Sequence, residues 1–171
     1  MIITGGLKIF WCIKRPRFTV TTTHRIFNNN NVLYIEKDLV DDLITVAESI
    51  DEECCGFLFG YERFGDRIVT ETMVAQNVAK NRRDRLFEIS PKEYLDAERY
   101  ADANNLKLLG FYHSHLDHPA IPSESDRIAA YPEMSYLIVS VINRKFKDIR
   151  SWRLNASARF DEEVINDRTI N

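Results

Sequence analysis

The segment GFYHSHLDHPAIPSESDRIAA, residues 110–130, is dense in side chains that bind metals or move protons. His113 and His115 stand two positions apart at the end of an apolar run, so on a β-strand both imidazoles project from the same face. Asp126 lies three positions beyond Ser123, a good N-cap residue, and on a helix capped by Ser123 it would face back from the first turn. Two imidazoles and one carboxylate that converge can hold a zinc ion and leave one position open to water.

The chemistry expected of such a site is hydrolysis. Zinc with an open position lowers the pKa of a bound water to about 7 and polarises a carbonyl group. A general base is still needed, and we expect it to be a carboxylate from elsewhere in the chain. Each half of the pattern also has a simpler explanation, because Ser123 and Asp126 form an ordinary helix-capping pair and an HxH on a strand is common. A capping pair does not explain why the strand end is rich in histidine.

The combined spacing resembles a known family. HxHx7SxxD is the signature of the JAMM (MPN-plus) zinc metallopeptidases, and it is matched at every defined position, by His113, His115, Ser123 and Asp126. The wider form HSHxDHPAxPSxxD is similar to the bacterial branch. The resemblance extends from about Val32 to Leu154. It implies one zinc per chain, with His113, His115 and Asp126 as ligands.

The family also carries a glutamate three positions before a glycine in a short apolar strand. In DEECCGFLFG this places Glu53 ahead of Gly56. The resemblance implies that Glu53 takes a proton from the attacking water and passes it to the leaving amine, and that Ser123 donates its hydroxyl to the oxyanion. From the residues alone, Glu52 stays open as an alternative to Glu53.

The resemblance implies a substrate as well: an amide or isopeptide bond after the C-terminal Gly-Gly of a ubiquitin-fold protein, of the sulfur-carrier type in small bacterial relatives. An extended tail could add to a sheet edge beside the zinc. The arginines of NRRDRLFEIS, residues 81–90, could face carboxylate groups there or form a solvated loop. Asp117 and His118 could be further ligands, but loop structure, substrate contact or, for Asp117, orientation of a ligand histidine fits better.

These residues need a scaffold of helices and strands. Apolar residues at helical spacing predict a helix over 36–50, and Ser90, Pro91 and Glu93 form the start of a second helix. A third, short helix is predicted at SESDRIAAY. Extended segments are predicted at CCGFLFG, RIVTETMVAQNV, LFEIS, LKLLGFYH, SYLIVSVIN and DIRSWRL. We therefore expect an α/β fold with a mixed β-sheet flanked by helices, and the resemblance implies a cytidine-deaminase-like JAMM/MPN architecture.

Composition and charge bound the remaining possibilities. The 171 residues are 44% hydrophobic and 29% charged, as in a globular protein, and we divide them into a basic N-terminal arm, residues 1–31, and a peptidase domain, residues 32–171. Residues 1–35 carry a charge of +5, so the remaining residues carry -3 - 5 = -8. An acidic domain of this kind is unsuited to binding the phosphates of nucleic acid. Three cysteines and the lack of a long apolar run predict a cytoplasmic protein that does not bind membranes. The oligomeric state stays open.

Two other functions compete with the peptidase. A zinc deaminase expects HxE together with PCxxC, and neither motif occurs in the sequence. A non-catalytic MPN-type scaffold or protein-binding module is the alternative from a different class. Such a module has no need of all five site residues, so their joint presence favours the enzyme.

Overall fold

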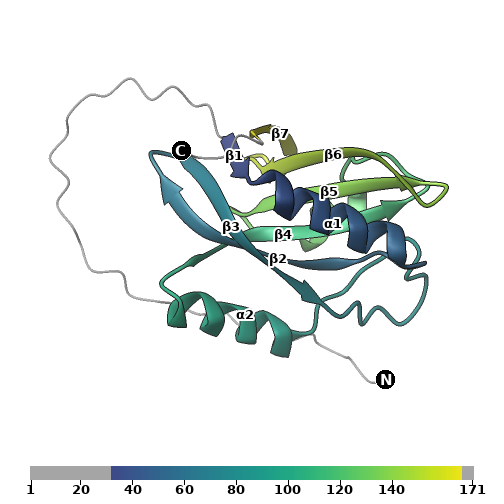
Figure 1. Ribbon diagram of the computed structural model, residues 1–171, viewed down its shortest axis with the longest axis horizontal. Helices are drawn as coiled ribbons and strands as arrows, with labels where there is room; N and C mark the ends of the chain where they lie inside the picture. Colours follow the sequence, from purple (N-terminus) through teal and green to yellow (C-terminus); the bar gives the residue numbers. More distant parts are fainter. Residues whose placement is uncertain (1–31, 167–171) are drawn as a thin grey trace, which may run out of the picture.

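The computed structural model describes residues 32–166, and these form seven strands and three helices (Figure 1). In chain order the elements are β1 (Val32–Ile35), α1 (Lys37–Ser49), β2 (Cys55–Arg63), β3 (Asp66–Ala75), α2 (Pro91–Ala103), β4 (Lys107–Leu116), α3 (Glu124–Ala129), β5 (Ser135–Ile142), β6 (Lys145–Leu154) and β7 (Phe160–Asn166). The predicted arm, residues 1–31, lies outside the described residues. None of the described helices is long and apolar enough to cross a membrane.

The strands close into a barrel in the order β1-β3-β2-β4-β5-β6-β7. β1 pairs in parallel with both β3 and β7, β4 pairs in parallel with β5, and the other neighbours are antiparallel. The fold is mixed α/β, as expected, but the prediction of a sheet flanked by helices was wrong in that the sheet is closed. The closing strands β1 and β7 are the two that the sequence analysis did not identify.

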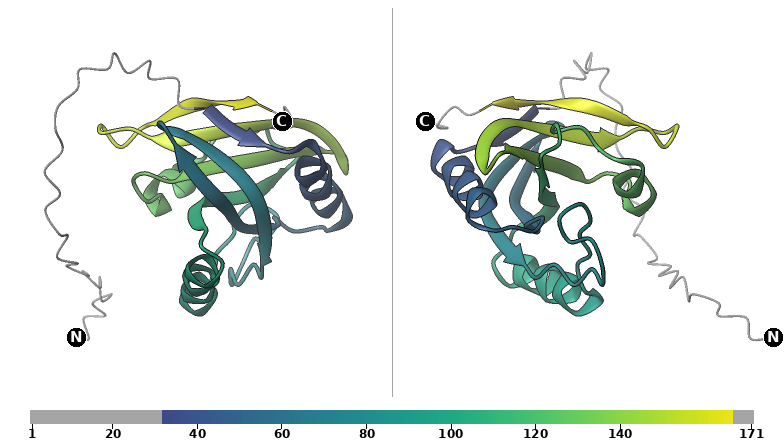
Figure 2. Two further views of the ribbon diagram at one scale, coloured as in Figure 1. Left: turned by 60° about the vertical axis from the view of Figure 1, so that its left-hand side comes forward. Right: turned by 90° about the vertical axis from the view of Figure 1, so that its right-hand side faces the viewer.

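Two apolar clusters lie on opposite faces of the strands. One contains residues of all seven strands together with Leu43 and Ala47 of α1, and the other joins the aromatic residues of β2 and β4 to Ala97 and Ala101 of α2. Figure 2 shows the two helices on different sides of the strands. The adjacent Cys54 and Cys55 belong to different clusters, as the alternation of a strand requires.

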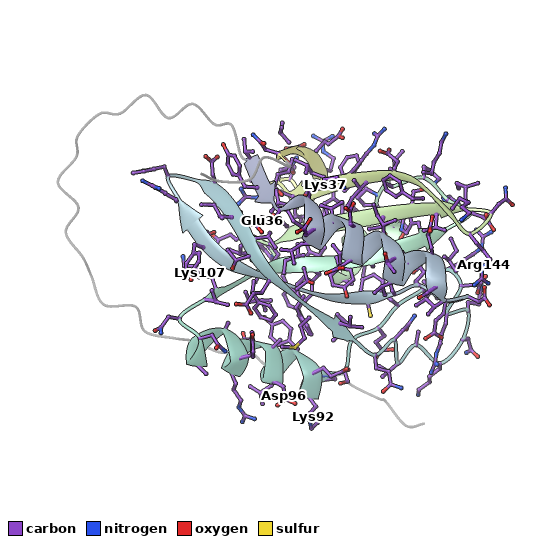
Figure 3. All side chains as sticks on the ribbon, viewed as in Figure 1. Glu36, Lys37, Lys92, Asp96, Lys107 and Arg144 are labelled. Atoms are coloured by element: carbon purple, nitrogen blue, oxygen red, sulfur yellow. The ribbon has the colours of Figure 1, made fainter. Side chains whose placement is uncertain are left out.

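Both long helices form as their sequences predict. The apolar side chains predicted to line one face of α1 all pack against the first cluster, two of them fully buried. Ser90 caps α2: its Oγ accepts a hydrogen bond from the backbone N–H of Glu93 at 3.2 Å and donates to the Glu93 carboxylate at 2.8 Å. Lys92 and Asp96 point outward from α2, away from the strands (Figure 3).

The segment between β3 and α2, residues 76–90, contains no strand, so the extended segment predicted at LFEIS does not join the sheet. We call residues 76–90 the 76–90 loop. A single backbone hydrogen bond, from Val78 N–H to Glu88 C=O at 2.9 Å, links its two arms. Side-chain contacts and further backbone hydrogen bonds also shape it, and the loop lies beside the histidines of β4.

Candidate active site

Strand β4 positions the two histidines. Cys55 of β2 pairs with His113, and Phe111, His113 and His115 alternate onto the face that carries the aromatic cluster. Gly56 permits the strands to pack this closely, because a Cβ there would lie 2.1 Å from the Met73 carbonyl oxygen and 2.5 Å from the Tyr112 ring. His113 is fully buried and His115 is 6% exposed, so both imidazoles are largely removed from solvent.

Helix α3 positions Asp126 through a reciprocal capping box. The Ser123 N–H donates to Asp126 Oδ2 at 2.6 Å, and the Asp126 N–H donates to Ser123 Oγ at 3.2 Å. The capping pair and the carboxylate that faces the histidines are therefore the same residues. The SxxD motif does cap helix α3, as the simpler explanation predicts. The same Asp126 carboxylate also faces the two histidines, so the cap and the potential metal site coexist.

His113, His115 and Asp126 converge on one point. The two Nε2 atoms are 3.1 Å apart, His113 Nε2 lies 3.6 Å from Asp126 Oδ1, and His115 Nε2 lies 3.6 Å from Asp126 Oδ2. Ligands about 2.0 to 2.1 Å from a tetrahedral zinc are separated by about 3.4 Å. The triangle of donor atoms thus has the size and the chemistry for zinc, and these three residues form the group among the described residues that could hold a metal ion.

The second nitrogen of His115 fixes its tautomer. His115 Nδ1 donates to the Pro119 carbonyl oxygen at 2.7 Å, which leaves the lone pair on Nε2 to face the metal position. The His113 ring is stacked on Phe87, with ring centroids 4.5 Å apart. In the described part of the chain, His113 Nδ1 is buried and has no hydrogen-bond partner.

The protonation states follow from burial and from the shared carboxylate. Burial lowers the pKa of His113, which favours the neutral imidazole that binds metals. Burial alone would lower the pKa of His115 too, but its interactions with Asp126 and the Pro119 carbonyl raise it overall. Burial opposes ionisation of Asp126, yet the two imidazoles hold its pKa well below the usual range. Asp126 therefore remains a carboxylate.

Glu53 precedes β2 and reaches the same site. The pairing of Cys55 with His113 continues through hydrogen bonds between Cys54 and Ser114, so the next pair in register sets Glu53 beside His115. Glu53 is 5% exposed, and desolvation raises the pKa of its carboxyl group from 4.5 to about 8, against a smaller lowering by His115. Glu52, the alternative left open by the sequence, is half-exposed and lies 3.5 Å from Arg83.

Asn77 ties Glu53 to the 76–90 loop. Its Nδ2 donates to the carbonyl oxygens of Glu53 at 3.1 Å and Leu86 at 2.9 Å, while its Oδ1 accepts from the N–H groups of Ala79 and Glu88. The Glu53 N–H in turn donates to the Arg83 carbonyl oxygen at 2.6 Å. The sequence analysis missed Asn77, because an asparagine after a strand carries no signal that distinguishes it from a turn residue.

Two cavities adjoin the three potential ligands. The polar cavity, of about 530 Å³, is lined by Glu53, His115 and Ser123 together with residues of the 76–90 loop and the β4–α3 loop. The aromatic cavity, of about 350 Å³, is lined by His113 and Asp126 together with Tyr94, Phe111, Tyr131 and other apolar residues. Leu86 and Ser125 line both cavities, so these two side chains stand between them.

Asp117 and His118 have different surroundings from the three potential ligands. Asp117 Oδ1 accepts a hydrogen bond from the Asn143 N–H at 2.8 Å, so its carboxylate closes the loop rather than orienting a histidine. The His118 ring meets the His115 ring edge-on, with centroids 6.1 Å apart, and it lines the polar cavity. Ser123 Oγ accepts from the Asp126 N–H, which leaves its own O–H free to donate.

A family model for prokaryotic homologues of the JAB domain matches residues 36–155. The chain belongs to this JAMM/MPN family. All of the residues discussed above for the site lie inside the matched range. The family resemblance inferred from the HxHx7SxxD spacing is therefore confirmed.

Named relatives of this JAMM/MPN chain align over most of their length. A desampylase of Pyrococcus furiosus is 30% identical over 142 residues, which is 79% of this chain and 90% of the relative. A CysO-cysteine peptidase of Mycobacterium tuberculosis is 31% identical over 136 residues, 78% of this chain and 90% of the relative. A solution structure of a Desulfitobacterium hafniense protein matches with a TM-score of 0.68 at 29% identity, covering 79% of this chain and 91% of that protein.

Proposed function

We propose that this protein is a zinc metallopeptidase that hydrolyses the amide or isopeptide bond after the C-terminal Gly-Gly of a ubiquitin-fold protein of the sulfur-carrier type. The observation that carries the proposal is the convergence of His113, His115 and Asp126 beside the buried carboxyl group of Glu53. The CysO-cysteine peptidase and the desampylase align across the whole site, which supports the same class of reaction.

In this proposal each residue has one task. Zinc at the three ligands would act as a Lewis acid and lower the pKa of the attacking water. Glu53 takes a proton from that water and delivers it to the leaving amine. In the metal-free chain, burial already raises the pKa of this carboxyl group toward the neutral range. The free O–H of Ser123 donates to the oxyanion that forms from the scissile carbonyl. The joint presence of these groups argues against a non-catalytic scaffold.

The decisive variant is Glu53→Gln, which keeps the size of the side chain and removes its proton transfer. We expect the zinc-loaded variant to bind one zinc per chain, as the wild type does, and to cleave a Gly-Gly-Ala-tailed ubiquitin-fold carrier about 1,000-fold more slowly. Metal content by mass spectrometry and release of alanine by chromatography give the two readouts.

Glu52→Gln is the matched control, since the neighbouring carboxylate is half-exposed and lies 3.5 Å from Arg83. We expect it to cleave at close to the wild-type rate. A wild-type protein that takes up no zinc, or a Glu53→Gln variant that cleaves as fast as the wild type, would contradict the proposal.

A further inference from the structure

The two cavities beside the potential metal ligands differ in the catalytic groups that line them. Glu53, the proposed donor to the leaving amine, lines the polar cavity and not the aromatic one. A leaving residue that receives its proton from Glu53 would therefore lie in the polar cavity, which Ser123 also lines. A cavity of about 530 Å³ lies within the size range of pockets that hold small ligands.

Two arginines of one turn line the polar cavity. Arg82 and Arg85 both line it, and the Arg85 N–H donates to the Arg82 carbonyl oxygen at 2.9 Å, which brings the two ends of the turn together. Arg83 is engaged elsewhere, because its Nε donates to the Ala79 carbonyl oxygen and it lies 3.5 Å from Glu52. The turn thus holds one arginine in structural contacts and two that line the polar cavity, of which Arg85 also lines a neighbouring cavity with acidic residues.

The charges of these two arginines are only weakly balanced. Arg85 lies 3.8 Å from Asp84, and both side chains are about half exposed. Within residues 32–166, no carboxylate forms a salt bridge with Arg82. Glu53 is the one acidic residue that lines the polar cavity. The cavity is therefore positively charged, and a guanidinium group is well shaped to bind a carboxylate through two parallel hydrogen bonds.

We propose that Arg82 and Arg85 bind the α-carboxylate of the leaving residue, so that the enzyme prefers a tail followed by a single terminal residue over a tail linked to a lysine side chain. This inference rests on the proposed peptidase function. In a terminal residue the carboxylate is separated from the scissile nitrogen by one carbon atom. In an isopeptide, the scissile nitrogen is the lysine Nζ, and the α-carbon with its own amide bonds lies four methylene groups away.

The test uses three substrates built on one ubiquitin-fold carrier, each cleaved by the zinc-loaded protein. The first ends in Gly-Gly-Ala with a free carboxylate, the second ends in the same sequence as the C-terminal amide, and the third joins the Gly-Gly tail to the Nζ of a lysine in a short peptide. We expect kcat/KM for the free acid to exceed that for the amide and for the isopeptide by about tenfold, which is the value of one hydrogen bond to a charged group.

Arg82→Gln and Arg85→Gln should each lower kcat/KM for the free acid toward that for the amide, mainly through KM, and lower it for the amide and the isopeptide by a clearly smaller factor. Lys80→Gln is the control, because it removes one positive charge from the same loop at a residue that lines neither cavity. It should keep the acid preference.

The outcomes separate the two proposals. A wild type that cleaves none of the three substrates overturns the proposed function itself. A wild type that cleaves acid and amide equally well, or an arginine variant that slows both by the same factor, overturns the carboxylate site and leaves the peptidase intact.

Discussion

At the scale of single residues, the metal-free site places a carboxyl group whose pKa is lowered close to one whose pKa is raised. Asp126 is held as a carboxylate by two imidazoles, whereas desolvation raises the pKa of Glu53 to about 8. Both side chains are largely buried, so burial alone does not explain why the two pKa values shift in opposite directions. The difference comes from the groups that each carboxyl group contacts. An ionised ligand and a proton carrier need these opposite environments.

The raised pKa of Glu53 gives the metal-free protein a predictable pH dependence. The folded chain binds this proton more tightly than the unfolded chain, so the free energy of unfolding falls as pH rises from about 4.5 to about 8. Glu53→Gln has no such proton. Between about pH 5 and about pH 7.5 we expect the metal-free wild type to lose about 3 kcal/mol of stability relative to Glu53→Gln.

Urea titrations of both proteins after treatment with a chelator, at the two pH values, measure this difference. Glu52→Gln is again the control, and its stability should follow that of the wild type because this carboxylate is half-exposed. A stability difference between wild type and Glu53→Gln that does not change with pH would show that Glu53 is ionised in the metal-free fold.

At the scale of elements, the features that were predictable from the sequence are those fixed by local periodicity. Two histidines at spacing two on a strand share a face whatever surrounds them, and a serine before a helix caps it through residues three positions away. The 76–90 loop was not predictable in this way. Its conformation depends on one buried asparagine that contacts Glu53, 24 positions earlier in the chain, and Glu88, 11 positions later.

Asn77 is therefore expected to be a positioning residue. Asn77→Ala removes both donors and the acceptor, which leaves the carbonyl groups of Glu53 and Leu86 without this partner and releases the loop beside the general base. We expect kcat to fall about 100-fold with a smaller change in KM, because a displacement of about 1 Å at the reacting groups costs that much. Unfolding should become easier by about 2 kcal/mol.

The zinc stoichiometry of Asn77→Ala should stay at one, because the ligands come from β4 and α3. Asn81→Ala changes an exposed asparagine of the same loop and should behave as the wild type. If Asn77→Ala unfolds more easily but cleaves with the wild-type kcat, the asparagine stabilises the fold and does not position Glu53.

At the scale of the whole molecule, a buried polar network that hydrophobic periodicity does not reveal links four strands of the barrel. Glu163 of β7 accepts hydrogen bonds from Ser135 of β5 and Ser151 of β6, each at 2.7 Å, and Arg67 of β3 donates to Ser135 at 2.7 Å. β1 has only four residues and β7 is rich in charged ones, so neither resembles a core strand in the sequence. The closure of the sheet was not predicted because one of these two strands is very short and the other is rich in charged residues.

Glu163→Ala tests this account of closure. The change leaves two buried hydroxyl groups without their acceptor and leaves the buried Arg67 with Glu62, a half-exposed partner at 3.5 Å. Breaking a buried charged network from one side is strongly unfavourable, so we expect a loss of about 3 kcal/mol in urea titrations. Glu162→Ala, on the same strand but exposed, should change stability by less than about 0.5 kcal/mol. Equal stabilities for the two variants would mean that apolar packing alone closes the barrel, because the buried carboxylate would then contribute no more than an exposed one.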